Sequence, residues 1–173
     1  MSELEQQWTN ALAEAERRAR AMGRHDIAEY VALRSTNDRV RRTAVDWLLT
    51  TFSELAADSN RNGASLQIEQ IDEHRFRIGH ATMVGRLLTL RFGARLLQVE
   101  AGWPRTAPDG FIRGGGFACA HIRHVGRPNL NDELLLIQPP ANAPQWEILE
   151  KNGERAVLTS ERIANHLAEL WKT

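Results

Sequence analysis

The chain has 173 residues, of which 42% are hydrophobic and 25% are charged, and its 22 basic residues balance its 22 acidic ones. These values are those of one average globular domain, so they exclude disordered and collagen-like chains, and no apolar run approaches the roughly 18–20 residues of a membrane span. The balanced charge gives no overall field that would attract nucleic acid or an anionic membrane. We therefore expect a single domain over residues 1–173 and no membrane partner.

The use of cysteine indicates the cellular compartment, and the use of arginine allows two interpretations. Cys119 is the single cysteine and cannot form an internal disulfide, which is typical of a reducing cytosol. The first 24 residues mix acidic and basic groups on an amphipathic pattern, unlike a secretory leader, so we expect a cytoplasmic protein. Lys151 and Lys172 are the only lysines beside many arginines. Planar anion recognition is one interpretation of this bias, and the codon usage of a GC-rich bacterium is the simpler one.

Helical spacing dominates the first part of the chain. Apolar residues recur every three or four positions and Gly23 follows as a stop signal, which predicts a helix over residues 2–22. A short second helix is expected from Asp26, because a glutamate follows at capping-box spacing. Ser35–Asp38 has the composition of another helix start, and the apolar spacing after it predicts the longest helix of the chain. Residues 1–58 are thus expected to form a layer of two or three helices.

Alternation of apolar and polar residues replaces helical spacing after the polar loop at residues 58–63. Strands are expected at residues 66–70 and 75–78, joined by a tight connection at Asp72–His74. A glycine-first turn at Gly93-Ala94 suits a type II′ hairpin. Its register then pairs Leu90 with Leu97, Leu88 with Val99 and Thr89 with Gln98, which separates apolar pairs from polar pairs on the two faces.

Shorter elements follow a long connection at residues 103–116, which is rich in Pro, Gly and Asp. Strands are expected at residues 117–123 and 134–138. Asn152-Gly153 predicts a two-residue hairpin turn, in which Lys151 faces Glu154 and Glu150 faces Arg155. A final helix begins near Thr159-Ser160 and carries Ile163, Leu167 and Leu170 on one face.

This order of elements predicts an α+β fold. The helical layer, residues 1–58, packs on a roughly seven-stranded, mainly antiparallel meander sheet, residues 64–158, and a C-terminal helix, residues 159–173, closes the chain. The short connections between strands favour antiparallel pairing, because parallel pairs need crossovers of a dozen or more residues.

Polar side chains on the sheet face opposite the predicted core form the leading candidate site, together with the 103–116 connection. Aromatic, arginine and histidine groups in one neighbourhood are used by protein-binding hot spots and by anionic pockets. The alternative is an ordinary solvated face with cross-strand ion pairs. The candidate binding residues, for a protein partner or an anion, are Arg91, Glu100, Trp103, Arg105, Arg113, His121 and Arg123.

Patterns for catalysis, metals and cofactors are weak. Cys119, His121 and His124 fall within six residues and His80 precedes them, but the sequence offers no clear fourth ligand for a metal. The glycine run 114–116 lacks a P-loop pattern and a following helix. No nucleophile elbow occurs. We therefore expect no catalytic residue, no metal and no cofactor.

Three hypotheses of function remain. The leading one is a non-catalytic cytosolic protein-binding or regulatory module, of adaptor or immunity type, that uses the polar sheet face and the 103–116 connection. The second is a nucleic-acid-binding regulator, since four arginines of the helical layer could meet phosphates, although acidic residues are interleaved with them: Arg17, Arg20, Arg39 and Arg42. The third is an enzyme or sensor that binds an anion through Arg113, His121 and Arg123. The first helix could also pack against a second copy and give a homodimer.

Overall fold

Two compact units make up the chain, residues 1–42 and 43–173, and the computed structural model describes residues 3–172. The first unit is a hairpin of α1 (Glu3–Ala21) and the beginning of α2 (His25–Arg61). The second unit contains the rest of α2, the sheet and α3 (Ser160–Ala168). A single domain over residues 1–173 stays a prediction.

The N-terminal helices agree with the sequence except at one start signal. Gly23 follows α1 with a φ of 72°, and the amide of Arg24 donates to the carbonyl of Ala19 at 2.8 Å, as a left-handed glycine cap requires. α2 then continues for 37 residues, so a separate helix beginning at Ser35–Asp38 is wrong. The Thr36 hydroxyl explains the difference, because it donates to the carbonyl of Ala32 at 3.0 Å inside the helix instead of capping a new one.

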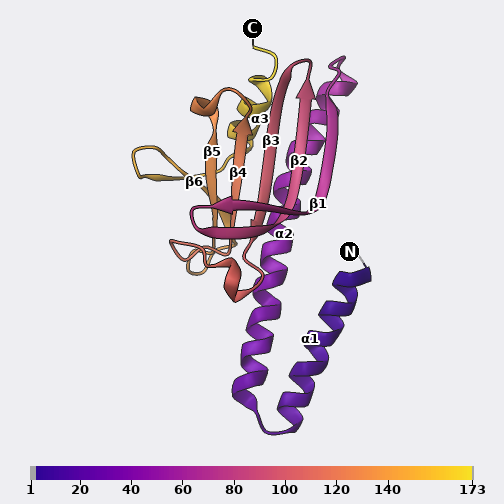
Figure 1. Cartoon of the computed structure of the whole chain (residues 1–173), viewed down its shortest axis with the longest axis vertical. Coiled ribbons are helices and arrows are strands. Elements are labelled where there is room, and N and C mark those ends of the chain that lie inside the picture. The colour runs from indigo at the N-terminus through magenta and orange to yellow at the C-terminus, as the bar shows by residue number, and fades with distance from the viewer. Residues whose placement is uncertain (1–2, 173) are drawn as a thin grey trace. The chain divides into compact units, whose positions relative to one another are not determined.

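Seven antiparallel strands form one open sheet in sequential order, and the predicted α+β meander is confirmed (Figure 1). A meander needs only short connections, which matches the lengths read from the sequence. The strands are β1 (Gln67–Ile78), β2 (Ala81–Phe92), β3 (Arg95–Trp103), β4 (Ala118–His124), β5 (Asp132–Ile137), β6 (Gln145–Leu149) and β7 (Arg155–Val157).

Two predicted hairpins have different outcomes. The β2–β3 register is confirmed: Leu90 pairs with Leu97, Leu88 with Val99 and Thr89 with Gln98. The β6–β7 register is wrong by one residue, since Leu149 pairs with Arg155. The turn contains three residues rather than two, with Gly153 at a φ of 85° and its amide donating to the carbonyl of Glu150 at 2.9 Å. Arg155 consequently forms its ion pair with Glu147, at 3.8 Å.

α3 and the part of α2 in the second unit cover one face of the sheet (Figure 1). The indole of Trp146 on β6 donates to the carbonyl of Ala44 on α2 at 3.0 Å. Burial of each large aliphatic side chain here stabilises the fold by about 1.5–3 kcal/mol. The predicted inner face of the final helix is confirmed, because Ile163, Leu167 and Leu170 are all buried. The fully buried side chains include Leu88, Leu90, Leu97, Ile122, Leu134 and Leu136 of the sheet, Leu48, Leu49 and Phe52 of α2, Ile163 of α3, and Leu170 in the turn that follows α3. Among the helices of residues 3–172, none combines the length and apolarity that crossing a membrane requires.

The end of the β1–β2 hairpin bends across the other face of the sheet (Figure 1). A turn at Asp72–His74 is therefore wrong: residues 67–78 form one strand, with a bulge between Ile71 and His74 and a φ of 57° at Glu73. Bulges bend strands and increase their twist. Beyond the bulge, Phe76 and Met83 pack with Cys119 and Leu135 in a buried apolar cluster, which we call the hairpin cluster.

A pair of glycines allows this bend. Gly85 on β2 lies opposite His74 at the bulge and opposite Gly102 on β3. A Cβ atom on Gly85 would lie 1.8 Å from the carbonyl oxygen of Ala101, and one on Gly102 would lie 2.6 Å from that of Val84. The two backbones approach too closely for any side chain, and this is the reason for glycine at both positions.

Candidate functional site

Four of the predicted binding residues share the sheet face opposite α2 and α3, which we call the free face and of which the end of the β1–β2 hairpin covers part. β3 and β4 place Glu100 opposite His121, and Arg123 lies two residues further along β4, opposite Gln98. Arg91 lies on the same face of β2, near the turn to β3. Alternation therefore correctly predicted a shared face, and Glu100, His121 and Arg123 are neighbours on it. Arg91 lies apart from them, four residues along β2 from Leu87, the residue that pairs with Glu100.

Glu100 is the centre of this site, and its carboxylate is held by three groups. The Nε2 atom of His74 lies 2.8 Å from Oε2, and the Nδ1 atom of His121 lies 3.4 Å from Oε1. The Nη2 atom of Arg123 lies 3.2 Å from Oε1. Glu100 is only 2% exposed, so its charge is buried but compensated. An ordinary solvated face does not describe this arrangement.

The protonation of Glu100 follows from these partners. Burial raises its pKa, but hydrogen bonds from His121 and His74 and the positive charge of Arg123 outweigh burial, and the pKa is lowered. Glu100 is thus ionised at neutral pH. A general acid or base works best with a pKa near the operating pH, so Glu100 is better suited to hold its neighbours in place than to transfer protons.

His74 is the residue of this site that the sequence did not indicate. It lies on the folded-over part of β1, where its ring stacks on Phe76 with the ring centroids 5.7 Å apart. Phe76 in turn lies 6.2 Å from the ring of His121. The sequence suggested a turn at His74, and only the bulge directs its side chain toward Glu100. No local pattern carried that information.

The thiol of Cys119 and the grouping of possible metal ligands are the remaining chemical features near this site. Burial and the charge of Glu133 raise the pKa of the Cys119 thiol to about 12, which leaves it protonated and unreactive. Within the described part of the chain, no three His, Cys, Asp or Glu side chains are grouped so that they could hold a metal ion.

The other predicted binding residues lie in the 103–116 connection and have separate roles. Trp103 is buried on the helix-covered face, and the guanidinium of Arg105 lies 3.7 Å from its ring centroid. Asp109 closes the next turn by accepting hydrogen bonds from the amides of Arg105 at 3.1 Å and Thr106 at 2.9 Å. Trp103 and Arg105 therefore fix the start of the connection.

The middle and the end of the connection are fixed as well. Ile112 packs against the hairpin cluster, and the amide of Phe117 donates to the carbonyl of Leu136 at 2.8 Å. Phe111, directly before Ile112, is 74% exposed, and Arg113, directly after it, is exposed as well. An anchored loop thus presents an aromatic ring and a guanidinium to solvent.

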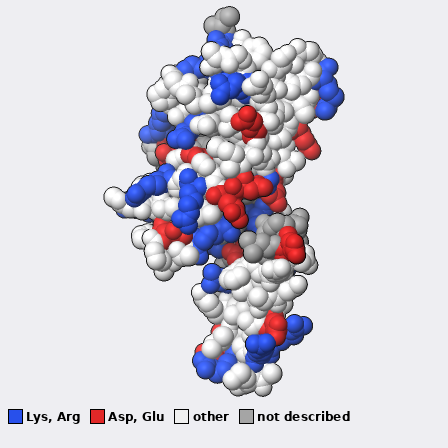
Figure 2. All heavy atoms as spheres, turned by 45° about the vertical axis from the view of Figure 1, so that its right-hand side comes forward, with Lys and Arg blue, Asp and Glu red and all other residues white. Residues whose placement is uncertain are grey.

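The arginines of the nucleic-acid hypothesis lie in the helical hairpin of the first unit. Arg20 pairs with Glu16 at 3.0 Å, and neighbouring arginines pair similarly, as in Arg41 with Asp38 at 3.0 Å. Arg17 and Arg39 are exposed, and Arg42 is half-buried. Figure 2 shows basic and acidic side chains next to one another on the face it displays. Local pairing reduces the positive field available to phosphates.

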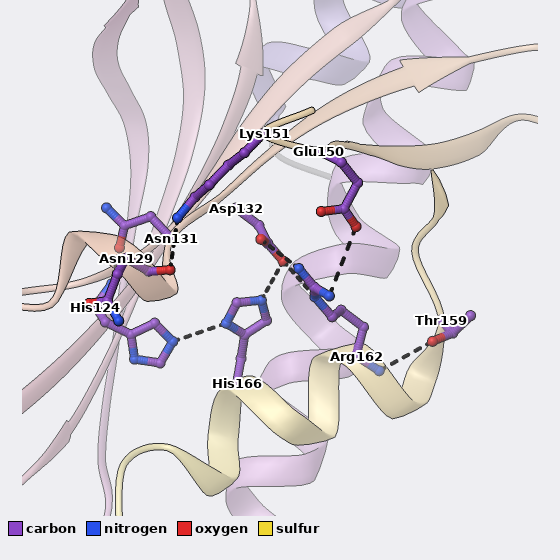
Figure 3. Close-up of polar contacts among 9 residues, drawn as sticks. All are labelled: His124, Asn129, Asn131, Asp132, Glu150, Lys151, Thr159, Arg162 and His166. Carbon is purple, nitrogen blue, oxygen red and sulfur yellow. Dashed lines mark hydrogen bonds and ion pairs between the residues drawn. The ribbon is translucent and has the colours of Figure 1, made fainter. Parts of the chain in front are cut away.

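A second polar cluster joins β4, β5 and α3 on the helix-covered face (Figure 3). His124 Nε2 lies 2.9 Å from His166 Nδ1, and His166 Nε2 lies 2.8 Å from Asp132 Oδ2. Arg162 donates to both oxygens of Asp132, at 2.8 and 2.9 Å. Asp132, His124 and His166 are all buried, so this chain of hydrogen bonds connects β4, β5 and α3 in the interior.

The partners in this cluster set the histidine tautomers. Burial raises the pKa of Asp132, but hydrogen bonds from His166 and Arg162 outweigh it and the pKa is lowered, so Asp132 is an acceptor. We assign the His166 proton to Nε2, which leaves Nδ1 to accept from His124 Nε2. His124 Nδ1 then carries only a lone pair, consistent with its lack of a hydrogen-bond partner among the described residues.

Acid is expected to destabilise the fold through His124. Burial and unfavourable electrostatic interactions with His166 and Arg127 lower the pKa of His124 to about 4, against about 6.5 in an unfolded chain. The unfolded state then binds more protons between these values, so the free energy of unfolding falls by about 3 kcal/mol as the pH drops through this window. Urea denaturation from pH 7 to 4 measures this change.

Two variants test the assignment to His124. His80→Gln, at an exposed position, should retain the pH dependence of the free energy of unfolding, whereas His124→Gln should reduce it. An unchanged pH dependence in His124→Gln would contradict the assignment.

Comparisons with known proteins identify no relative of this chain. No protein-family model matches the chain, and no curated protein or solved structure matches it. Its class is therefore described by its own features: an α+β protein with an open seven-stranded meander, a compensated buried carboxylate and an anchored loop.

Proposed function

We propose that the chain is a non-catalytic protein-binding module of the bacterial cytosol, of adaptor or immunity type, whose partner contacts the 103–116 connection and the adjoining free sheet face. The observation that carries this proposal is Phe111, 74% exposed beside the packed side chain of Ile112. Aromatic residues and arginine are enriched at protein interfaces, and a loop that is already ordered loses little conformational entropy on binding.

Charge on the free face supports a partner with acidic groups. Glu100 fixes one end of the Arg123 guanidinium, while the Arg123 side chain remains 47% exposed. Arg91 and Arg113 are exposed as well. Guanidinium groups held in place by buried carboxylates are favourable partners for carboxylates on another protein, because complementary charges provide specificity and faster association.

The chemistry of the site also favours binding over catalysis. The pKa of Glu100 is lowered by hydrogen bonds that outweigh its burial, and the pKa of the Cys119 thiol is raised by burial. Neither group is tuned for acid–base or nucleophilic work at neutral pH. A single, buried thiol also suits a reducing cytosol.

Affinity capture tests the class of partner. The tagged full chain is incubated with lysate of its source organism, with and without nuclease, and bound material is identified by mass spectrometry. The proposal predicts one protein in near-stoichiometric amount that resists nuclease. Recovery that depends on intact nucleic acid would favour Arg17, Arg20, Arg39 and Arg42 instead. A chain that captures no protein, and whose melting temperature rises with nucleotides or phosphate esters, would favour an anion site at Arg113, His121 and Arg123.

A further inference from the structure

The helical hairpin of the first unit has an apolar groove along one side. Small side chains of α1 line the groove, Met22 and Ile27 lie at its end, and charged groups lie on its rim. The lining residues are Ala11, Glu14, Ala15, Arg18, Ala19, Met22, Arg24 and Ile27. Alanines four residues apart leave room for a second helix to approach closely, as packing of ridges into grooves requires.

Little of the hairpin's apolar surface is covered. Among the described residues of the hairpin, 3–42, the buried hydrophobic side chains are Ala19 and Ala28. Met22 is 79% exposed and Tyr30 is 64% exposed. Exposed apolar area of this kind marks interaction sites in proteins that are otherwise stable.

The charges on the rim identify what fits the groove. Glu14 and Arg18 form an ion pair with each other, and they lie on either side of the middle of the α1 part of the groove, which runs from Ala11 to Met22. A two-fold axis through that middle turns α1 antiparallel onto α1 of a second copy. It brings Glu14 of each copy close to Arg18 of the other, and the small Ala11 close to the large Met22 of the other.

We propose that this groove is the contact between two copies of the chain, with their α1 helices packed antiparallel. A contact of this symmetry must be self-complementary, and the groove meets that condition in both charge and size. The charges of Glu14 and Arg18 alternate in sign across the contact, and the apolar lining of each copy covers that of the other. Arg24, the third charged residue of the lining, forms an ion pair with Asp26 of its own chain at 3.7 Å. The contact uses residues 11–27 and is independent of the protein-binding surface at residues 103–116.

Sedimentation equilibrium of the full chain tests the proposal. We expect the mass to rise from 19.6 kDa toward twice that value with increasing concentration, with a dissociation constant of about 1–10 µM for a small interface. Ala15→Glu places a charge in the groove of both copies and should raise the dissociation constant at least about 100-fold. Ala13→Glu is the matched control, because Ala13 is exposed and does not line the groove, and it should change the constant by less than about 3-fold.

Charge reversal tests the antiparallel arrangement itself. Arg18→Glu should raise the dissociation constant about 10-fold, because it places like charges across the contact, and the exchange Glu14→Arg with Arg18→Glu should restore it. Circular dichroism checks that each variant keeps its helices. A 19.6 kDa species at all concentrations, equal weakening by Ala15→Glu and Ala13→Glu, or a double exchange as weak as Arg18→Glu would each overturn the proposal.

Discussion

Gly85→Ala is expected to abolish folding or to lower the free energy of unfolding by at least about 4 kcal/mol, a large part of the total stability of a domain. The new Cβ atom would lie 1.8 Å from the Ala101 oxygen and 2.5 Å from the Gly102 Cα atom. Both are backbone atoms of the paired strand, so relief requires β2 and β3 to separate. The φ of Gly85 is not in the left-handed region, and the effect is therefore one of space alone.

Gly115→Ala provides the matched control for this prediction. Gly115 has a φ of 74° and nothing within 4 Å of its Cβ position, so alanine there costs only the backbone strain of about 1–2 kcal/mol. Guanidinium denaturation of both variants, with soluble yield as a first indication, measures the difference. If Gly85→Ala were as stable as Gly115→Ala, the bend of the β1–β2 hairpin over the sheet would be wrong.

Asp132→Asn is the second substitution with a large expected effect. Asp132 accepts hydrogen bonds from Arg162 and from the buried ring of His166. The asparagine amide keeps the shape of the carboxylate but removes its charge. It also places an NH2 group where one carboxylate oxygen accepted hydrogen bonds from N–H groups. Removing one partner of a buried charge network destabilises proteins by about 3–5 kcal/mol. We expect a loss of that size at pH 7, measured by urea denaturation.

The comparison for Asp132 is Asp58→Asn. Asp58 on α2 pairs with Arg61, and both side chains are more than half exposed. Such surface pairs contribute about 0–1 kcal/mol, so the variant should unfold near the wild-type midpoint. Equal losses in Asp132→Asn and Asp58→Asn would show that the polar cluster between β4, β5 and α3 does not hold α3 to the sheet.

The parts of the fold that the sequence predicted correctly rest on local signals. Gly93-Ala94 defined both a turn and a register, because a shift by one residue would have exposed the leucines of β2 and β3. Thr159 begins α3 as an N-cap, accepting from the amide of Arg162 at 3.2 Å. Alternation along β3 and β4 also placed Glu100, His121 and Arg123 on one face.

The errors arose where one local composition is compatible with two structures. Asp72–His74 has the composition of a turn, but packing of Phe76 on Cys119 and Leu135 favours a bulged strand. Ser35–Asp38 has the composition of a helix start, yet helical hydrogen bonds continue through it. His74 joined Glu100 only as a consequence of the bulge, so the sequence alone could not include it in the site.

The most direct test of the protein-binding surface is the affinity of the captured partner for the Phe111→Ala variant, measured by calorimetry. Removing a central aromatic side chain from an interface typically costs about 2 kcal/mol or more, and we expect affinity to fall at least about 30-fold. Trp47→Ala also removes an exposed aromatic side chain, but from α2, which covers the opposite face of the sheet, so this variant should bind as the wild type does. Undiminished affinity in Phe111→Ala would contradict the assignment of the 103–116 connection as the binding surface.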